Sequence, residues 1–290
     1  MTGQALPSHT TKPWPVIRNA IVTFLDYARP HAVGTLVEID VTDALSALRA
    51  FQRELRIALS LHAFLVFCLV RTAAEIEGAR TYRLGKRRLI TFDDVDISTP
   101  IDKRLPSGVR IPVGYIMRAA QRKTLAQVFW DLRGAIKAKD LDQDPAVRMR
   151  RRFAAMPGPI RRLIAWRIMR DPFRLKQIHG TIGLSSVQSI GDHVPAFPLV
   201  PTVHTLSAVV GTLCDRLRLA EDGRVERRRV LCVTISCDHD VMDGMPFARF
   251  TQRFNQLVGS AHGLDKAFAD EIRALLATRK EEGRHDTSDP

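Results

Sequence analysis

The stretch "VTISCDHDVMDG", residues 233–244, constrains the fold more than any other part of this chain. It places an apolar run directly before His239, and a turn-forming Asp-Gly pair follows. A strand that ends here would hold the imidazole rigidly enough to serve as a general base. Metal binding is disfavoured, because successive strand residues such as Asp238, His239 and Asp240 point to opposite faces. Most histidines beside turns are bystanders, so the residues alone leave a catalytic base and an ordinary polar histidine both open.

The composition is that of an ordinary globular protein, with 45% hydrophobic and 26% charged residues in a chain of 290. The first 15 residues lack the apolar core of a secretory signal. Residues 61–70 are the most apolar run, far shorter than the roughly 18–20 residues that span a bilayer. The cysteines, which lack CxxC spacing and therefore predict free thiols rather than a zinc site, are Cys68, Cys214, Cys232 and Cys237. We expect a cytoplasmic protein. A peripheral contact with a membrane is a further expectation for the basic segment described next.

The net charge of +13 is concentrated in one segment. Residues 148–176 hold ten Lys or Arg and one acid, Asp171, which gives that segment a charge of +9. Its prolines, Pro157, Pro159 and Pro172, predict two or three short helices. The segment is either a solvated helical cover or a binding surface. A membrane surface, an acidic acyl carrier protein and the phosphates of CoA all suit its charge, whereas no nucleic-acid-binding motif is present.

The remaining pattern predicts one α+β domain over residues 1–277, with the basic insert at about 148–176 and a charged, disordered tail at 278–290. Alternating or apolar β-prone runs predict strands, and apolar stripes with helical spacing predict helices. The predicted strands include 33–42, 180–191, 202–213 and 227–239, and the predicted helices include 43–55, 58–77, 124–139 and 245–261.

Four stretches resemble one known family in the same order. "HDVMDG" (239–244) fits the motif H-x-x-x-D-G, and residues 233–258 resemble the C-terminal end of the acyltransferase (E2) catalytic domain of 2-oxoacid dehydrogenase complexes. Chloramphenicol acetyltransferase shares that fold and that motif. The other three stretches are "VEIDVTDALSALR", "ITFDDVDISTPID" with the "VRIPVGYIMRAAQRKTLAQV" that follows it, and "GTIGLSSVQSIG". The resemblance covers roughly residues 16–260, interrupted by the basic insert.

The resemblance implies a chloramphenicol acetyltransferase-like fold, with a mixed, mainly antiparallel sheet and covering helices. It also implies a thioester-dependent acyltransferase in which His239 takes the proton of a thiol or hydroxyl acceptor. Ser185, with Ser186 as the alternate, would donate a hydrogen bond to the tetrahedral oxyanion. Asp243 would hold the loop and Gly244 would permit the turn. No metal and no tightly bound cofactor are expected, and CoA or acyl-CoA is the expected substrate; lipoyl and carrier-protein thioesters are the other donors.

The resemblance further implies a homotrimer, or a multiple of one, with His239 of one chain facing Ser185 of the next. The expectation of a trimer rests on the length of the chain, because monomeric relatives carry two such domains in tandem and 290 residues have room for one. The alternative is a non-catalytic relative, a scaffold or carrier-binding protein that docks a partner or membrane through the basic insert.

Three departures from the family pattern matter. No lipoyl domain or flexible linker precedes the catalytic region, so a role as the core of a dehydrogenase complex would need lipoyl groups on another protein. Asp240 stands where the family motif D-H-R has arginine, and its carboxylate would raise the pKa of His239. The basic insert replaces a short loop.

Overall fold

The computed structural model describes residues 14–28, 31–85, 87–104, 110–137, 145–187, 194–220 and 222–285. The main sheet consists of β1 (Ala32–Asp40), β4 (Ile97–Arg104), β5 (Arg110–Met117), β6 (Ile182–Ser186), β7 (Leu206–Leu219) and β8 (Val225–Asp238). A separate hairpin pairs β2 (Thr81–Leu84) with β3 (Arg88–Thr91). The helices are α1 (Arg18–Leu25), α2 (Thr42–Leu55), α3 (Leu61–Glu75), α4 (Leu125–Lys137), α5 (Pro145–Ala155), α6 (Gly158–Met169), α7 (Pro172–His179), α8 (Gly244–Gly259) and α9 (Lys266–His285), with short 3-10 turns at Glu77–Arg80 and Ala120–Arg122.

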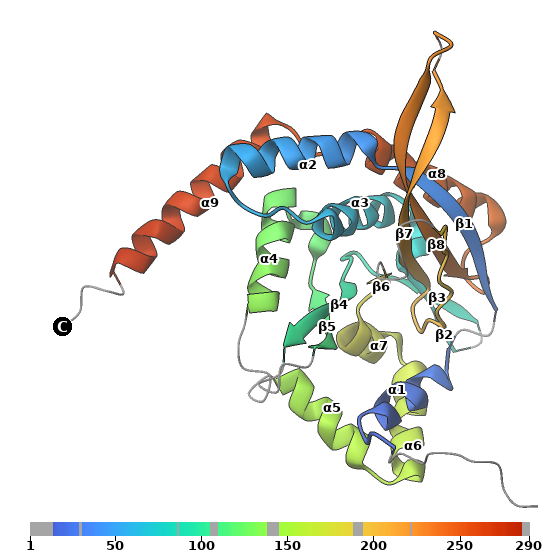
Figure 1. Cartoon of the computed structure of the whole chain (residues 1–290). Helices are drawn as coiled ribbons and strands as arrows, with labels where there is room; N and C mark the ends of the chain where they lie inside the picture. The colour runs from blue at the N-terminus through green and yellow to red at the C-terminus, as the bar shows by residue number, and fades with distance from the viewer. Residues whose placement is uncertain are drawn as a thin grey trace, which may run out of the picture.

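The sheet is mixed, in the order β1-β8-β7-β6-β4-β5. Strand β6 runs parallel to both of its neighbours, and every other pairing is antiparallel. The β7–β8 hairpin is longer than the rest of the sheet and projects from the body of the molecule (Figure 1). The α+β architecture with a mixed, mainly antiparallel sheet is therefore confirmed.

The core lies between one face of the sheet and the helices α2, α3, α4, α8 and α9 (Figure 1). Helix α3 is apolar almost all round, and residues 63–70 are buried without interruption. Ser60 caps its first turn by accepting a hydrogen bond from the N–H of Ala63 at 3.4 Å. Because burial of a large apolar side chain contributes about 1.5–3 kcal/mol, Phe64, Leu65 and Leu69 anchor this layer.

The opposite face of the sheet carries the alternate residues of each strand. On β6, Ile182 and Leu184 point into the core, which puts Gly183 and Ser185 on the other face. Part of that face is covered by the segment 194–203, which runs so close to β7 that a Cβ on Gly211 would lie 2.0 Å from the carbonyl oxygen of Ala196.

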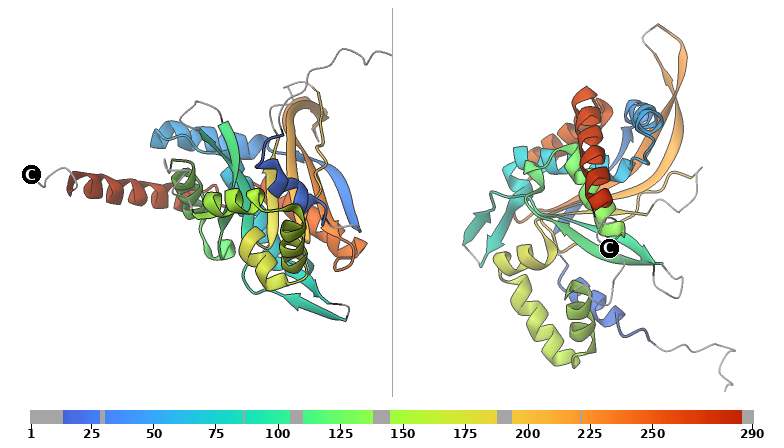
Figure 2. Two further views of the ribbon diagram at one scale, coloured as in Figure 1. Left: turned by 90° about the horizontal axis from the view of Figure 1, so that it is seen from below. Right: turned by 90° about the vertical axis from the view of Figure 1, so that its left-hand side faces the viewer.

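The basic insert forms the three helices α5, α6 and α7, which pack with α1 away from α2 and α9 (Figures 1 and 2). As the prolines predict, α5 ends before Pro157 and α7 begins at Pro172. The expected disordered tail is wrong over residues 278–285, because α9 continues to His285; the rest of the tail lies outside the described residues. The four cysteines are free and buried. Over the described residues, no helix is long and apolar enough to cross a membrane.

Candidate active site at the end of β8

Strand β8 delivers His239 to its end, as the sequence predicts. The N–H of Asp238 donates to the carbonyl of Thr205 at 2.8 Å, which closes the last rung between β8 and β7. The carbonyl of Asp238 then accepts the N–H groups of Val241 and Met242, each at 3.1 Å, and this forms the turn. The His239 side chain is 50% exposed, so a substrate can reach the imidazole.

Two residues that the sequence analysis did not single out hold this turn. The carbonyl of His31 accepts the N–H of His239 at 3.0 Å, and the His31 imidazole Nδ1 lies 2.8 Å from Oδ1 of Asp240. From β2, Arg83 donates to the other carboxylate oxygen of Asp240 at 2.8 Å. These hydrogen bonds, that of His31 first, lower the pKa of the Asp240 carboxyl. The carboxylate expected to act on His239 is thus committed to His31 and Arg83.

Asp243 and Gly244 differ from their expected roles within this chain. The Asp243 side chain is 86% exposed, and its Oδ1 lies 3.9 Å from Nδ1 of His239, which is too long for a hydrogen bond. The loop is held by His31 and Asp240 instead. Gly244 begins α8 without a positive φ, and a Cβ there would meet nothing within 4 Å. The turn itself therefore does not require glycine at this position.

Ser185 lies far from His239 in the same chain. It pairs with Val209 on β7, which pairs with Thr234 on β8, and His239 follows five residues later. At about 3.4 Å per residue and about 4.8 Å per strand, the two side chains are about 20 Å apart. Ser186, the alternate, is next along β6 and points to the opposite, helix-covered face.

Within the described part of the chain, the imidazole of His204 lies beside the Ser185 face. A Cβ on Gly183, two residues before Ser185, would lie 2.8 Å from its Nδ1. Nε2 of His204 lies 2.7 Å from the carbonyl of His179, and Nδ1 lies 3.2 Å from the hydroxyl of Thr202. These contacts hold the ring in place over β6, where it borders the Ser185 site.

Comparison with known proteins finds a similar catalytic domain for about a third of the chain, in its C-terminal half. Residues 174–264 match the family model described as 2-oxoacid dehydrogenases acyltransferase (catalytic domain). This segment contains Ser185, His239 and Asp243. No sequence among curated proteins matches the chain. The family match confirms the resemblance stated from the sequence and the expectation of an acyltransferase-type catalytic domain.

Solved structures share the fold over most of the chain. A probable dihydrolipoamide acetyltransferase from Listeria monocytogenes superposes with a TM-score of 0.64 at 17% identity, over 87% of this chain and 95% of that one. The cubic core of the pyruvate dehydrogenase multienzyme complex gives a TM-score of 0.60 at 18% identity, over 90% and 99%. A dihydrolipoamide acetyltransferase from Azotobacter vinelandii gives 0.59 at 17%, over 90% and 99%. At these identities the structures show the fold alone.

Proposed function

We propose that this chain is a thioester-dependent acyltransferase whose general base is His239. The observation that carries the proposal is the position of an accessible imidazole on a strand–turn–helix junction inside the segment that matches the acyltransferase model. The donor is an acyl thioester of CoA, of a lipoyl group or of a carrier protein. The acceptor is a thiol or a hydroxyl.

In the proposed reaction the imidazole of His239 takes the proton of the acceptor thiol, and the thiolate attacks the carbonyl carbon of the thioester. The carbonyl oxygen becomes an oxyanion that accepts a hydrogen bond from the hydroxyl of Ser185. Collapse of the tetrahedral intermediate breaks the bond to the donor sulfur. The imidazolium returns its proton to that sulfur, so the base is regenerated and no co-reactant is consumed.

The separation of about 20 Å between Ser185 and His239 supports a site between two copies of the chain. A base and an oxyanion donor must both lie within about 3 Å of the reacting group, which one chain cannot provide. The Azotobacter structure was studied for a serine, a histidine and an asparagine in catalysis, and its asparagine follows its histidine by four residues. Asp243 follows His239 at the same spacing. A trimer or a multiple of one would bring His239 of one copy to Ser185 of the next.

Subunit complementation tests this arrangement. The variants His239→Ala and Ser185→Ala are expected to be nearly inactive alone, because each removes one half of every site. When the two are co-expressed and purified through two tags, every trimer is mixed and holds one site of three with both residues intact, so about one third of wild-type activity is expected. The measurement is acyl-dihydrolipoamide formation from a series of acyl-CoA donors, with the co-expressed proteins purified through two different tags.

A mixture no more active than the single variants would place both residues in one chain and contradict the shared site. The alternative scaffold function predicts something else: no thioester turnover by the wild-type protein with any CoA, lipoyl or carrier-bound donor. A co-expressed pair of His239→Ala and His239→Asn is the matched control. It assembles in the same way and is expected to stay inactive, because no mixed site then contains the base.

Asp240 is expected to act as a positioning residue for His239. We expect Asp240→Ala to lower kcat by about tenfold with little change in KM, because the turn loses the contacts to His31 and Arg83 that orient it. Asp222→Ala is the control, since Asp222 also binds an arginine, Arg224, but lies at the tip of the β7–β8 hairpin. Equal loss of kcat in both variants would show a general effect of charge removal and no positioning.

A further inference from the structure

Helix α1 and the insert helix α6 turn apolar side chains outward. Trp14 and Ile17, which precede α1, and Ile21, within it, are 56%, 46% and 57% exposed. On α6, Ile160, Leu163 and Trp166 are 51%, 61% and 39% exposed. We call the three residues of α6 the docking face. Large apolar side chains that gather on a surface usually mark an interaction site.

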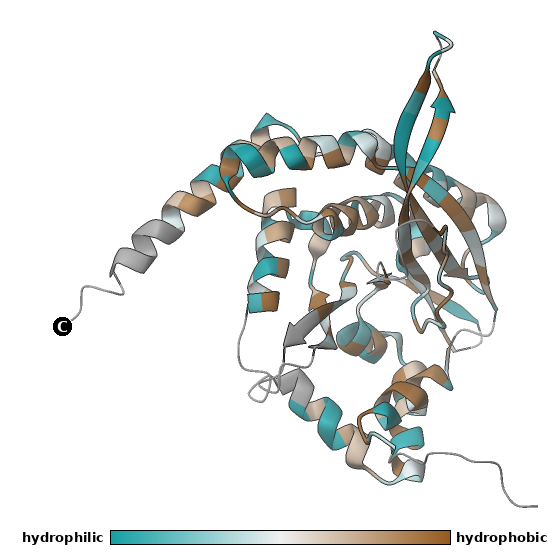
Figure 3. Ribbon diagram, in the orientation of Figure 1, coloured by the Kyte–Doolittle hydropathy of each residue, from teal (hydrophilic) through white to brown (hydrophobic). Residues whose placement is uncertain are grey.

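Helix α6, which carries the docking face, belongs to one packed unit with α1 and α5. Phe24 of α1 stacks on Phe153 of α5, with ring centroids 5.3 Å apart. The hydroxyl of Tyr27, just after α1, donates to the carbonyl of Arg162 on α6 at 3.2 Å. Arg161 of α6 donates to the hydroxyl of Thr23 at 2.7 Å, so Arg161 faces α1 and the opposite side of α6, which carries Leu163 and Trp166, points away from α1. Figures 2 and 3 show α1 against α6, with apolar residues along α1 in brown.

Arginines surround the apolar residues of α6. Arg162, Arg167 and Arg170 are exposed on this helix, and the Arg170 guanidinium lies 4.4 Å from the ring centre of Trp166. Within the described part of the chain, no ion pair engages Arg162 or Arg167. Asp171, the acidic residue of the insert, binds within α7. It caps this helix by accepting the N–H groups of Phe173 and Arg174, and it pairs with the Arg174 side chain.

A groove of about 430 Å³ opens between α6 and α7 beside the docking face. Ile164, Ile168 and Ile178 line it with apolar surface, and Arg167 and Arg174 stand in the same lining. An apolar groove with two guanidinium groups suits a molecule that carries an acyl chain below an anionic group.

We infer that the docking face binds the surface of a membrane that contains anionic phospholipid. Trp166 and Leu163 would enter the boundary between headgroups and acyl chains, while the arginines around them would bind lipid phosphates. Charge favours this occupant over a two-fold contact with a second copy of the chain, because such a contact would bring the same +9 segment against this one. The inference does not depend on acyl transfer, since none of its residues belongs to the proposed catalytic site.

Vesicle flotation with the purified full-length protein tests the inference. We expect the protein to float with vesicles of phosphatidylcholine and phosphatidylglycerol, and to stay behind with phosphatidylcholine alone. High salt weakens this binding, because it screens the arginines. The double variant Leu163→Ser/Trp166→Ser is expected to bind anionic vesicles at least about tenfold more weakly, since it loses the apolar contact and keeps every charge.

The matched control is Leu217→Ser/Leu219→Ser, which removes two even more exposed apolar residues from the distant β7–β8 hairpin. It is expected to bind vesicles as the wild type does. No binding of the wild-type protein to anionic vesicles would overturn the inference, and so would binding that the Leu163→Ser/Trp166→Ser variant retains in full. Loss of oligomer in that variant, seen by analytical ultracentrifugation, would also overturn it by showing that a second copy covers the face.

Discussion

Replacement of His239 by alanine is expected to lower kcat for acyl transfer by about 10²-fold or more, which is the usual contribution of a positioned general base. The acceptor thiol must lose its proton to attack, and His239 is the proposed base. The side chain is half exposed and its place in the turn is fixed through its backbone N–H, which alanine retains. Folding should therefore be unaffected, as the melting temperature and the oligomer size will show.

His262→Ala serves as the control for this variant. His262 is also an exposed histidine beside a turn at the end of a helix, where it stacks on Phe67 with ring centroids 6.0 Å apart. It should keep wild-type turnover. If His239→Ala turns over thioesters at nearly the wild-type rate, the proposed base is wrong.

The sequence predicts the elements around the site because each carries a local signal. The run before His239 is apolar and β-prone, and the stripe of Phe247, Phe250 and Phe254 has helical spacing, so the strand, the turn and α8 can all be expected from residues 233–258. The helices of the insert can also be predicted from local sequence, because Pro157 and Pro172 interrupt helical backbone hydrogen bonding in any tertiary context.

What the sequence does not reveal depends on contacts between distant segments. His31 meets His239 because β1 pairs with β8, with Ala32 opposite Asp238, and Arg83 reaches Asp240 only because its hairpin packs beside that edge. Register and hairpin placement are tertiary properties, so no local pattern carries them.

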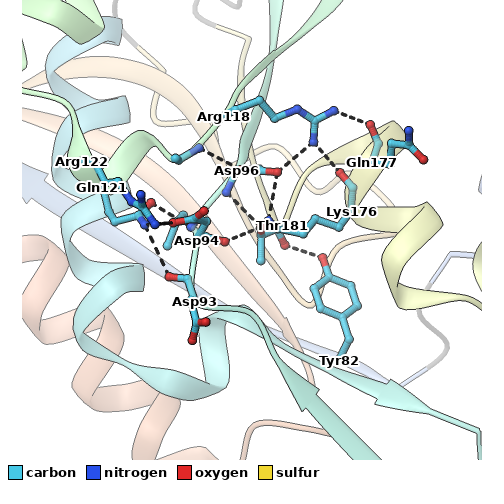
Figure 4. Close-up of polar contacts among 12 residues, drawn as sticks. Tyr82, Asp93, Asp94, Asp96, Arg118, Gln121, Arg122, Lys176, Gln177 and Thr181 are labelled. Atoms are coloured by element: carbon cyan, nitrogen blue, oxygen red, sulfur yellow. Dashed lines mark hydrogen bonds and ion pairs between the residues drawn. The ribbon is translucent and has the colours of Figure 1, made fainter.

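Loss of Asp96 is expected to destabilise the protein strongly, because this residue ties the basic insert to the sheet. Asp96 is 4% exposed and lies just before β4. One carboxylate oxygen accepts from Arg118 at 2.8 Å and lies 3.3 Å from the ammonium of Lys176 on α7, and the other accepts the N–H of Ala119 at 2.9 Å (Figure 4). Arg118 also donates to the carbonyls of Lys176 and Gln177. The cluster thus fixes the end of α7 against the point where the chain enters β6.

Asp96→Ala is expected to lower the free energy of unfolding by about 3 kcal/mol, because loss of one partner from a buried pair leaves the other without compensation. The half-exposed Arg118 can recover some solvation, which keeps the cost at the lower end of the range for such pairs. Urea titration measures the change. Asp94→Ala is the control: Asp94 also binds an arginine, Arg122, whose side chain is 71% exposed, and a pair this accessible contributes under about 1 kcal/mol. Equal losses of unfolding free energy in the two variants would show that the burial of Asp96 does not make its ion pair more stabilising than an exposed one.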